Sequence, residues 1–83
     1  MPTICREQGF RIVIYPADHR PAHVHVMRAG SEAVFHMNCP DGPPSLRENR
    51  GFDGPTLNRI KSRLMGCLDR LCQAWREIHG NYR

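Results

Sequence analysis

The residues on either side of Ala29-Gly30 alternate between apolar and polar side chains, and this pattern constrains the fold more than any other. Successive side chains of a β-strand point to opposite faces of a sheet. Residues 22–28 and 31–37 therefore predict two antiparallel strands, joined by a short loop whose glycine can adopt positive φ. If Arg28 pairs with Ser31, the numbers of paired residues sum to 59 along the whole hairpin.

This register separates the side chains of the hairpin by their chemistry. One face carries Val24, Val26, Ala33 and Phe35, and the other carries His23, His25, Val34 and His36. A shift of one residue would move Phe35 among the histidines and His36 among the valines. We therefore expect the valine face to enter the core and the histidine face to lie outside it.

A further strand is predicted before the hairpin. Residues 9–15 are rich in β-branched and aromatic side chains and end at Pro16, with Phe10, Ile12 and Ile14 on one face. After the hairpin, the prolines and glycine of residues 40–44 predict a loop that continues to Arg50, with room for a short strand over residues 45–48.

The C-terminal third has the periodicity of an amphipathic helix. Asp53 is the expected N-cap and Pro55 fits the first turn. Apolar residues then recur every three or four positions, and Gly80-Asn81 is a C-cap signal. They are Leu57, Ile60, Leu64, Leu68, Leu71, Trp75 and Ile78. The pattern predicts one long helix or, if Gly66 interrupts it, two helices.

Together these elements predict a single α+β domain over residues 1–83. A three- to four-stranded antiparallel sheet is expected, with the helix packed on one face. A chain of this length buries only about 60% of its unfolded surface, so its core is thin. Because one helix covers one face, the histidine face is either exposed to solvent or in contact with another chain.

Composition narrows the class of protein. No apolar run is long enough to cross a membrane and the N-terminus lacks a secretory signal, so we expect a cytoplasmic protein. The formal net charge is +4, and all but one of the 12 basic residues are arginines. This bias suits an anionic partner, and a GC-rich genome explains it equally well. Cys5, Cys39, Cys67 and Cys72 are expected to be free thiols.

The histidine face is the candidate site. It is expected to contain His23, His25 and His36 with Arg11 and Tyr15, and the adjoining loop adds His19 and Arg20. In one interpretation His23, His25 and His36 bind a divalent metal such as zinc, with Asp18 or His19 as an added ligand from the loop. We otherwise expect no cofactor.

Other interpretations need no metal. His23 and His25 could act as acid and base on a phosphodiester whose charge Arg11 or Arg20 neutralises. The same side chains could instead form a binding surface for an acidic protein or a nucleic acid, or be tolerated polar residues without a function. We assign no catalytic residue, and whether the chain is an enzyme is left open.

The order of several short segments resembles a known family. They are Met1-Pro2-Thr3-Ile4, Arg6-Glu7, Gly9-Phe10-Arg11, Asp18-His19-Arg20-Pro21, His23-Val24-His25-Val26, Asn49-Arg50-Gly51-Phe52 and Ala74-Trp75. Over nearly the whole chain this pattern resembles the small prokaryotic proteins grouped as domain of unknown function 4160. The chain has Ala22 where members carry a second proline, and its loop at residues 38–44 is longer.

Members of this family are often encoded beside another small protein, so the resemblance implies a small module of a toxin–antitoxin-like pair. We therefore expect a basic binding module that engages a protein or nucleic-acid partner. A metal- or histidine-dependent hydrolase or nuclease is the alternative.

Overall fold

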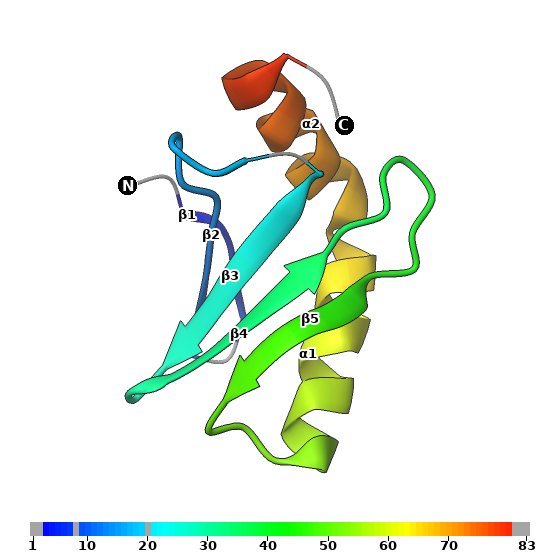
Figure 1. The fold of residues 1–83 in the computed structure, drawn as a ribbon. Coiled ribbons are helices and arrows are strands. Elements are labelled where there is room, and N and C mark those ends of the chain that lie inside the picture. Colours follow the sequence, from blue (N-terminus) through cyan, green and yellow to red (C-terminus); the bar gives the residue numbers. More distant parts are fainter. Residues whose placement is uncertain (1–2, 8, 20, 81–83) are drawn as a thin grey trace.

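The computed structural model describes residues 3–7, 9–19 and 21–80. Within these ranges, five strands precede two helices (Figure 1). The strands are β1 (Thr3–Glu7), β2 (Phe10–Val13), β3 (His23–Arg28), β4 (Ser31–His36) and β5 (Ser45–Arg50), and the helices are α1 (Gly54–Gly66) and α2 (Leu68–His79).

Each strand pairs antiparallel with the next one in the chain, so the order across the sheet is β1-β2-β3-β4-β5. The predicted α+β class is confirmed. The prediction of three to four strands is too low for the described part of the chain, because it did not include β1. That segment is short and has no turn signal before it, so its sequence alone does not mark a strand.

The register of the central hairpin is the predicted one. Val24 pairs with Phe35, His25 with Val34, and Arg28 with Ser31. Ala29 and Gly30 both have positive φ, at 48° and 86°, which is the backbone of the two-residue turns whose twist matches that of the flanking strands. The turn therefore fixes the register in agreement with the apolar pattern.

Both helices lie against the same face of the sheet, and the apolar residues between them form the core (Figure 1). Phe10, Ile12, Ile14, Val24, Val26 and Phe35 are all at most 1% exposed, as the predicted faces require. The helices contribute Ile60, Leu64, Leu68, Leu71 and Trp75, whereas Ile78 is 36% exposed. The apolar stripe is therefore buried from Ile60 to Trp75, and Leu57 is half-buried.

The helical region is divided at Cys67, directly after Gly66, so two helices form rather than one long helix. The side chain of Asp53 accepts a 2.9 Å hydrogen bond from the backbone N–H of Thr56, which confirms the predicted N-cap. Hydrogen bonding from the side chain and then from the backbone of Thr56 lowers the pKa of the Asp53 carboxyl below its usual value. Gly80, at φ 91°, follows α2, and Asn81 lies outside the described residues.

The cysteines differ from the prediction. Cys39 and Cys72 form a disulfide, with their Cα atoms 5.8 Å apart, and the free thiol of Cys67 is half-buried. The prediction of free thiols is wrong for the bonded pair because 33 positions separate them in sequence, whereas folding places the loop after β4 against α2. The side chain of Cys5 lies outside the described part.

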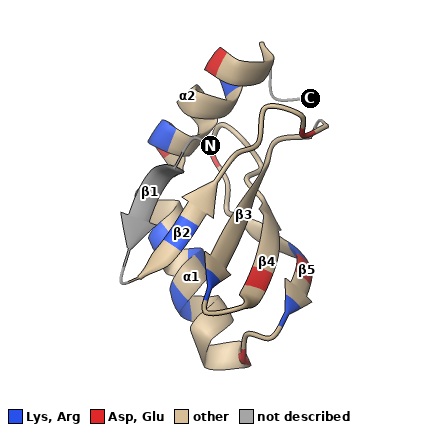
Figure 2. Cartoon of the chain, turned by 90° about the vertical axis from the view of Figure 1, so that its left-hand side faces the viewer, with Lys and Arg blue, Asp and Glu red and all other residues tan. Residues whose placement is uncertain are grey.

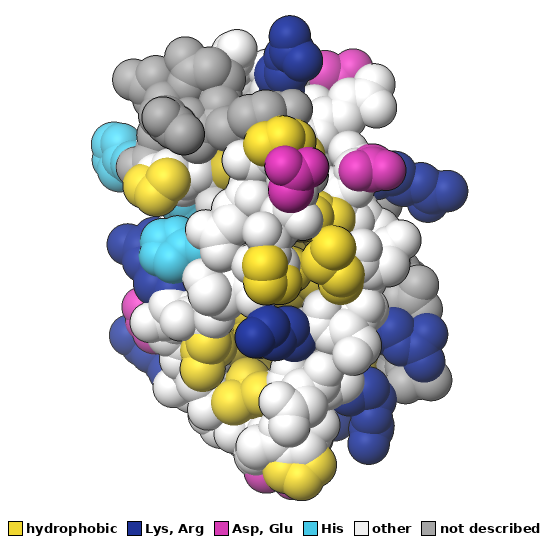
Figure 3. Space-filling model, turned by 90° about the vertical axis from the view of Figure 1, so that its right-hand side faces the viewer, with side chains coloured by type: hydrophobic (Ala, Val, Ile, Leu, Met, Phe, Trp, Pro, Cys, Tyr) yellow, Lys and Arg dark blue, Asp and Glu magenta, His cyan; other side chains and the backbone are white. Residues whose placement is uncertain are grey.

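The surface carries its charges on several elements. Figure 2 shows lysines and arginines on both helices and on strands rather than on a single element. On the face in Figure 3, charged side chains interrupt the hydrophobic ones. Within the described ranges, no helix is long and apolar enough to cross a membrane.

Candidate functional site

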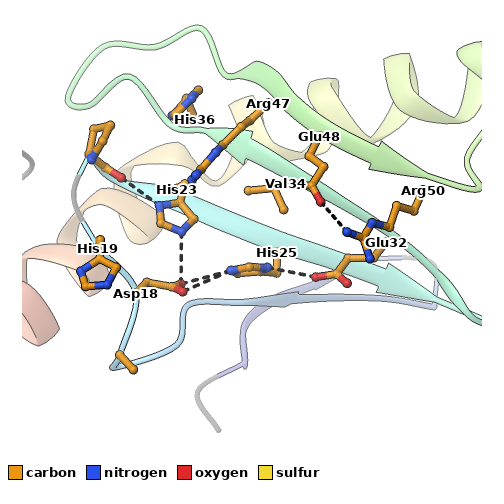
Figure 4. A pocket seen from close by; sticks show the side chains of 12 residues that line it. Asp18, His19, His23, His25, Glu32, Val34, His36, Arg47, Glu48 and Arg50 are labelled. Atoms are coloured by element: carbon orange, nitrogen blue, oxygen red, sulfur yellow. Dashed lines mark hydrogen bonds and ion pairs between the residues drawn. The ribbon is translucent and has the colours of Figure 1, made fainter.

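The face of the sheet opposite the helices holds a pocket of about 520 Å³ between β3, β4, β5 and the loop that joins β2 to β3 (Figure 4). Its lining is rich in groups that ionise or bind metals. The lining residues are Ala17, Asp18, His19, Pro21, His23, His25, Glu32, Val34, His36, Arg47, Glu48 and Arg50.

Asp18 is held in the pocket by a turn of the loop. Its backbone N–H donates to the carbonyl of Tyr15 at 3.0 Å, and its carboxylate accepts from the backbone N–H of Tyr15 at 3.2 Å. Aspartate commonly closes turns with its own side chain in this way. The turn therefore directs the carboxylate of Asp18 toward the start of β3.

His23 is fixed on two sides. Its Nδ1 lies 2.9 Å from the carbonyl oxygen of Pro21, and a carbonyl oxygen can only accept, so this nitrogen is the donor. The centre of the ring lies 5.3 Å from that of Trp75 on α2. His23 is 4% exposed, and its Nε2 points to Asp18 (Figure 4). Burial and the Nδ1–H donor thus set both the position of the ring and its tautomer.

His25 is held in the same way by different partners. Its Nδ1 lies 3.0 Å from the carboxylate of Glu32 on β4, and its Nε2 lies 3.2 Å from Oδ2 of Asp18. The ring of Tyr15 meets it edge-on, with the ring centres 4.8 Å apart. Glu32 accepts a hydrogen bond from Nδ1–H of His25, and the Nε2 atom is directed at the carboxylate of Asp18.

Three potential metal ligands therefore converge. One ligand atom from each of Asp18, His23 and His25 lies within 4.8 Å of the other two. Oδ2 of Asp18 is 3.5 Å from Nε2 of His23 and 3.2 Å from that of His25. Two ligands of a tetrahedral zinc ion, each about 2.0–2.2 Å from the metal, lie about 3.3–3.5 Å apart. The two distances from Asp18 to the histidines are close to that spacing.

Positive charge on the rings or between them favours this convergence. With Nδ1 of each ring protonated, a neutral imidazole presents a lone pair at Nε2. The lone pairs of His23 and His25 would then face the carboxylate oxygens of Asp18 with no hydrogen between them. A proton on each ring removes this repulsion, and so does one metal ion bound by all three residues.

His36 was the predicted third metal ligand, and the structure leaves it outside this group. It pairs with His23 across the hairpin, as predicted, but its ring points away from Asp18 (Figure 4). Asp18 takes that place because the loop turn carries its carboxylate to the two Nε2 atoms. Burial, the charge of Arg47 and His23 together lower the pKa of His36 from its usual value.

Some of the other predicted site residues lie at the pocket and some do not. His19 lines the pocket beside Asp18, and Tyr15 contacts His25 from the side. Arg11 pairs with Met27 and lines a separate hollow near the Ala29-Gly30 turn, so the structure does not bring it to the histidines. Arg20 lies outside the described residues.

Four charged lining residues were missed by the sequence-based prediction: Glu32, Arg47, Glu48 and Arg50. Glu32 could have been predicted, because the predicted register pairs it with Met27. That pair is the next one after His25 and Val34 on the same face. The other three lie on β5, which sequence patterning predicts only as a short segment.

Comparison with known proteins gives one match. The model of the family described as "Domain of unknown function (DUF4160)" matches residues 9–80. No curated protein and no solved structure matches the chain. The match covers the sheet from β2 onward, the loop with Asp18, and both helices. The chain therefore belongs to the DUF4160 family.

Proposed function

We propose that the chain is a small metal-binding module, in which Asp18, His23 and His25 hold a divalent ion that recognises an anionic group on a partner. The observation that carries the proposal is the convergence of two Nε2 atoms on one carboxylate, at 3.2 and 3.5 Å. Imidazole and carboxylate are common ligands of zinc and related ions.

The surroundings of the three ligands fit a bound metal ion. Histidines that bind metals usually donate their second ring N–H to a carboxylate or a backbone carbonyl. Glu32 and Pro21 supply one acceptor of each kind. The ligand side chains are also shielded, with exposed fractions of 15% for Asp18, 5% for His23 and 17% for His25.

Calorimetric titration with zinc tests this site. We expect one ion per chain, with an affinity that falls at least about tenfold in Asp18→Asn and His25→Gln, since each loses a ligand. His36→Gln is the matched control, because it removes a pocket histidine outside the cluster. Cys5 and Cys67 are replaced by serine in every protein tested, since thiolates also bind zinc.

Two results would contradict the metal site. One is equal zinc affinity in wild type and Asp18→Asn. The other is a loss in His36→Gln as large as the loss in His25→Gln.

Hydrolysis is the second candidate function. It is favoured by the three-residue ligand set, because catalytic zinc sites keep a fourth position for water and this cluster borders an open pocket. The zinc-loaded chain is expected to cleave an activated phosphodiester faster than free zinc does, and Asp18→Asn is expected to lose that rate. Equal rates with and without the protein would reject hydrolysis and leave the binding proposal in place.

The partner is a protein or a nucleic acid, and a second small protein in a toxin–antitoxin-like pair is one form of it. The basic composition supports an anionic partner in either case. If the ion is the contact point, removing it with a chelator is expected to release the partner. Retention of the partner by Asp18→Asn in the presence of chelator would contradict this role.

A further inference from the structure

Arg47 occupies an irregular position beside the pocket. Val34 pairs with Glu48 and the next residue, Phe35, pairs with Leu46, so Arg47 is the extra residue of a β-bulge in β5. Bulges turn a side chain away from the direction that the regular strand would give it. Figure 4 shows the side chain of Arg47 extending from β5 over the pocket that His23 and His36 line.

The guanidinium of Arg47 has no ion-pair partner among the residues that the structure describes. Arg50, two positions along the same strand, differs because it pairs with Glu48 at 3.4 Å. Both arginines line the pocket and both are exposed. Arg47 is therefore the positive group whose donors remain available to a ligand.

The charge of the pocket depends on the metal. Among its described lining residues, the three carboxylates of Asp18, Glu32 and Glu48 outnumber the two guanidiniums of Arg47 and Arg50. With neutral histidines and a divalent ion bound, the pocket carries one net positive charge, which a single monoanionic group neutralises.

We infer that the bound ion and Arg47 together bind the phosphate of a phosphodiester. This inference rests on the metal site proposed above and names its ligand. A phosphodiester is a monoanion at neutral pH, and its single charge is shared by two non-bridging oxygens that can reach two separate cations. One oxygen binds the ion, while the other accepts hydrogen bonds from the planar guanidinium, for which phosphate is a preferred partner.

The size of the pocket fits a ligand with a group on each side of the phosphate. A volume of about 520 Å³ lies within the range of about 300–1,000 Å³ for small-molecule sites. The pocket is also open rather than enclosed, so the two ester substituents can leave it in different directions (Figure 4). The surplus of positive charge on the whole chain favours such ligands as part of a longer polyanion.

The test measures binding of the thymidine dinucleotide dTpdT, which has one phosphodiester and no terminal phosphate, to the zinc-loaded chain by calorimetry. We expect Arg47→Gln to weaken this binding by about tenfold or more, since it removes a charge-assisted hydrogen bond. Arg50→Gln, the matched control on the same strand, is expected to change it by less than about threefold because Glu48 already pairs with Arg50.

Zinc titration without dinucleotide separates the two proposals. Arg47→Gln is expected to keep the wild-type affinity for zinc. If zinc does not bind to the wild type, the proposal of a metal site is wrong, and so is the proposal that the ion and Arg47 together bind phosphate. If zinc binds normally and Arg47→Gln binds dTpdT as well as the wild type does, only the inference about Arg47 is overturned.

Competing ligands define the chemical class. Dimethyl phosphate is expected to displace dTpdT, whereas two dianions, thymidine 5′-monophosphate and the dicarboxylate N-acetylglutamate, are expected to compete weakly. Tighter binding of dTpdT than of dimethyl phosphate identifies a nucleic-acid source, and equal binding shows that the diester group alone is recognised. Stronger competition by the monophosphate or by the carboxylate overturns the inference.

Discussion

Neighbouring residues of the β3–β4 hairpin point to opposite faces of the sheet, and different forces hold the side chains on each face. On the helix side, Val24, Val26 and Phe35 are at most 1% exposed and pack among apolar side chains without directional contacts. On the pocket side, His23 and His25 are each held by a hydrogen bond from Nδ1 and directed at one carboxylate. The first face supplies stability, and the second positions chemical groups.

The difference determines what a substitution does on each face. Removing a core side chain leaves a cavity that the whole domain must absorb, so the loss appears in the free energy of unfolding. Removing a polar group of the pocket breaks the orientation of one ring and leaves the core packing intact. The two faces are therefore expected to respond to mutation in different measurements.

Phe35→Ala is expected to give the largest effect. Phe35 is 1% exposed, and its truncation is expected to lower the free energy of unfolding by about 3–5 kcal/mol, a large part of the total for a small domain. Val34→Ala, the adjacent residue on the pocket face, is expected to cost only about 1–2 kcal/mol. Urea denaturation measures both, and equal losses would remove the distinction between the faces.

Loss of the disulfide is expected to come next. Because the bond between Cys39 and Cys72 closes a loop across 33 positions, the double variant Cys39→Ser/Cys72→Ser is expected to lose about 2–4 kcal/mol of unfolding free energy. The bond lies on the helix side, so zinc affinity is expected to stay within about threefold of wild type. A loss of zinc affinity without a loss of stability would show that the disulfide supports the pocket rather than the core.

Glu32→Gln is expected to act on the pocket face alone. The change keeps the shape of the side chain but removes the charge that accepts the Nδ1 proton of His25, and such changes typically lower metal affinity about 10–100-fold. Glu48→Gln, a pocket carboxylate outside the histidine network, serves as the control. Zinc titration and thermal unfolding together check that affinity falls while stability holds.

The smallest expected effect concerns the N-cap of α1. Hydrogen bonding from the side chain and the backbone of Thr56 lowers the pKa of Asp53. Its stabilising contribution is therefore present above the unfolded-state pKa and is lost as pH falls through the folded-state pKa. Thermal midpoints of wild type and Asp53→Ala are therefore expected to differ most at pH 7, and the difference is expected to shrink as the carboxyl becomes protonated in acid. Asp53→Asn keeps an acceptor without the titration, so a pH-dependent difference between Asn and Ala would contradict this explanation.

Most of the fold was predictable because the spacing of apolar residues indicates which side chains are buried. The positions of Val24 and Phe35 set the hairpin register, and the interval between Ile60 and Leu64 identifies the helical stripe. The disulfide partners were not predictable from local patterns, because nothing near Cys39 in sequence indicates its approach to α2.

The candidate site was only partly predictable for a related reason. His23 and His25 follow from strand alternation, whereas the choice of Asp18 over His36 depends on a loop turn closed by Tyr15 and on the rotation of each ring. Arg47 depends on a bulge, which sequence patterning does not locate. Predicting directional contacts thus requires the backbone conformation of the loops, whereas predicting burial requires only the periodic spacing of apolar residues.

Imidazole nitrogen NMR during a zinc titration tests the central claim most directly. We predict that Nε2 of His23 and of His25 shift together as one equivalent of zinc is added, while both Nδ1 atoms keep their protons and the His36 ring is unaffected. Unchanged His23 and His25 nitrogens, or a response at His36 in their place, would contradict a metal site built from Asp18, His23 and His25.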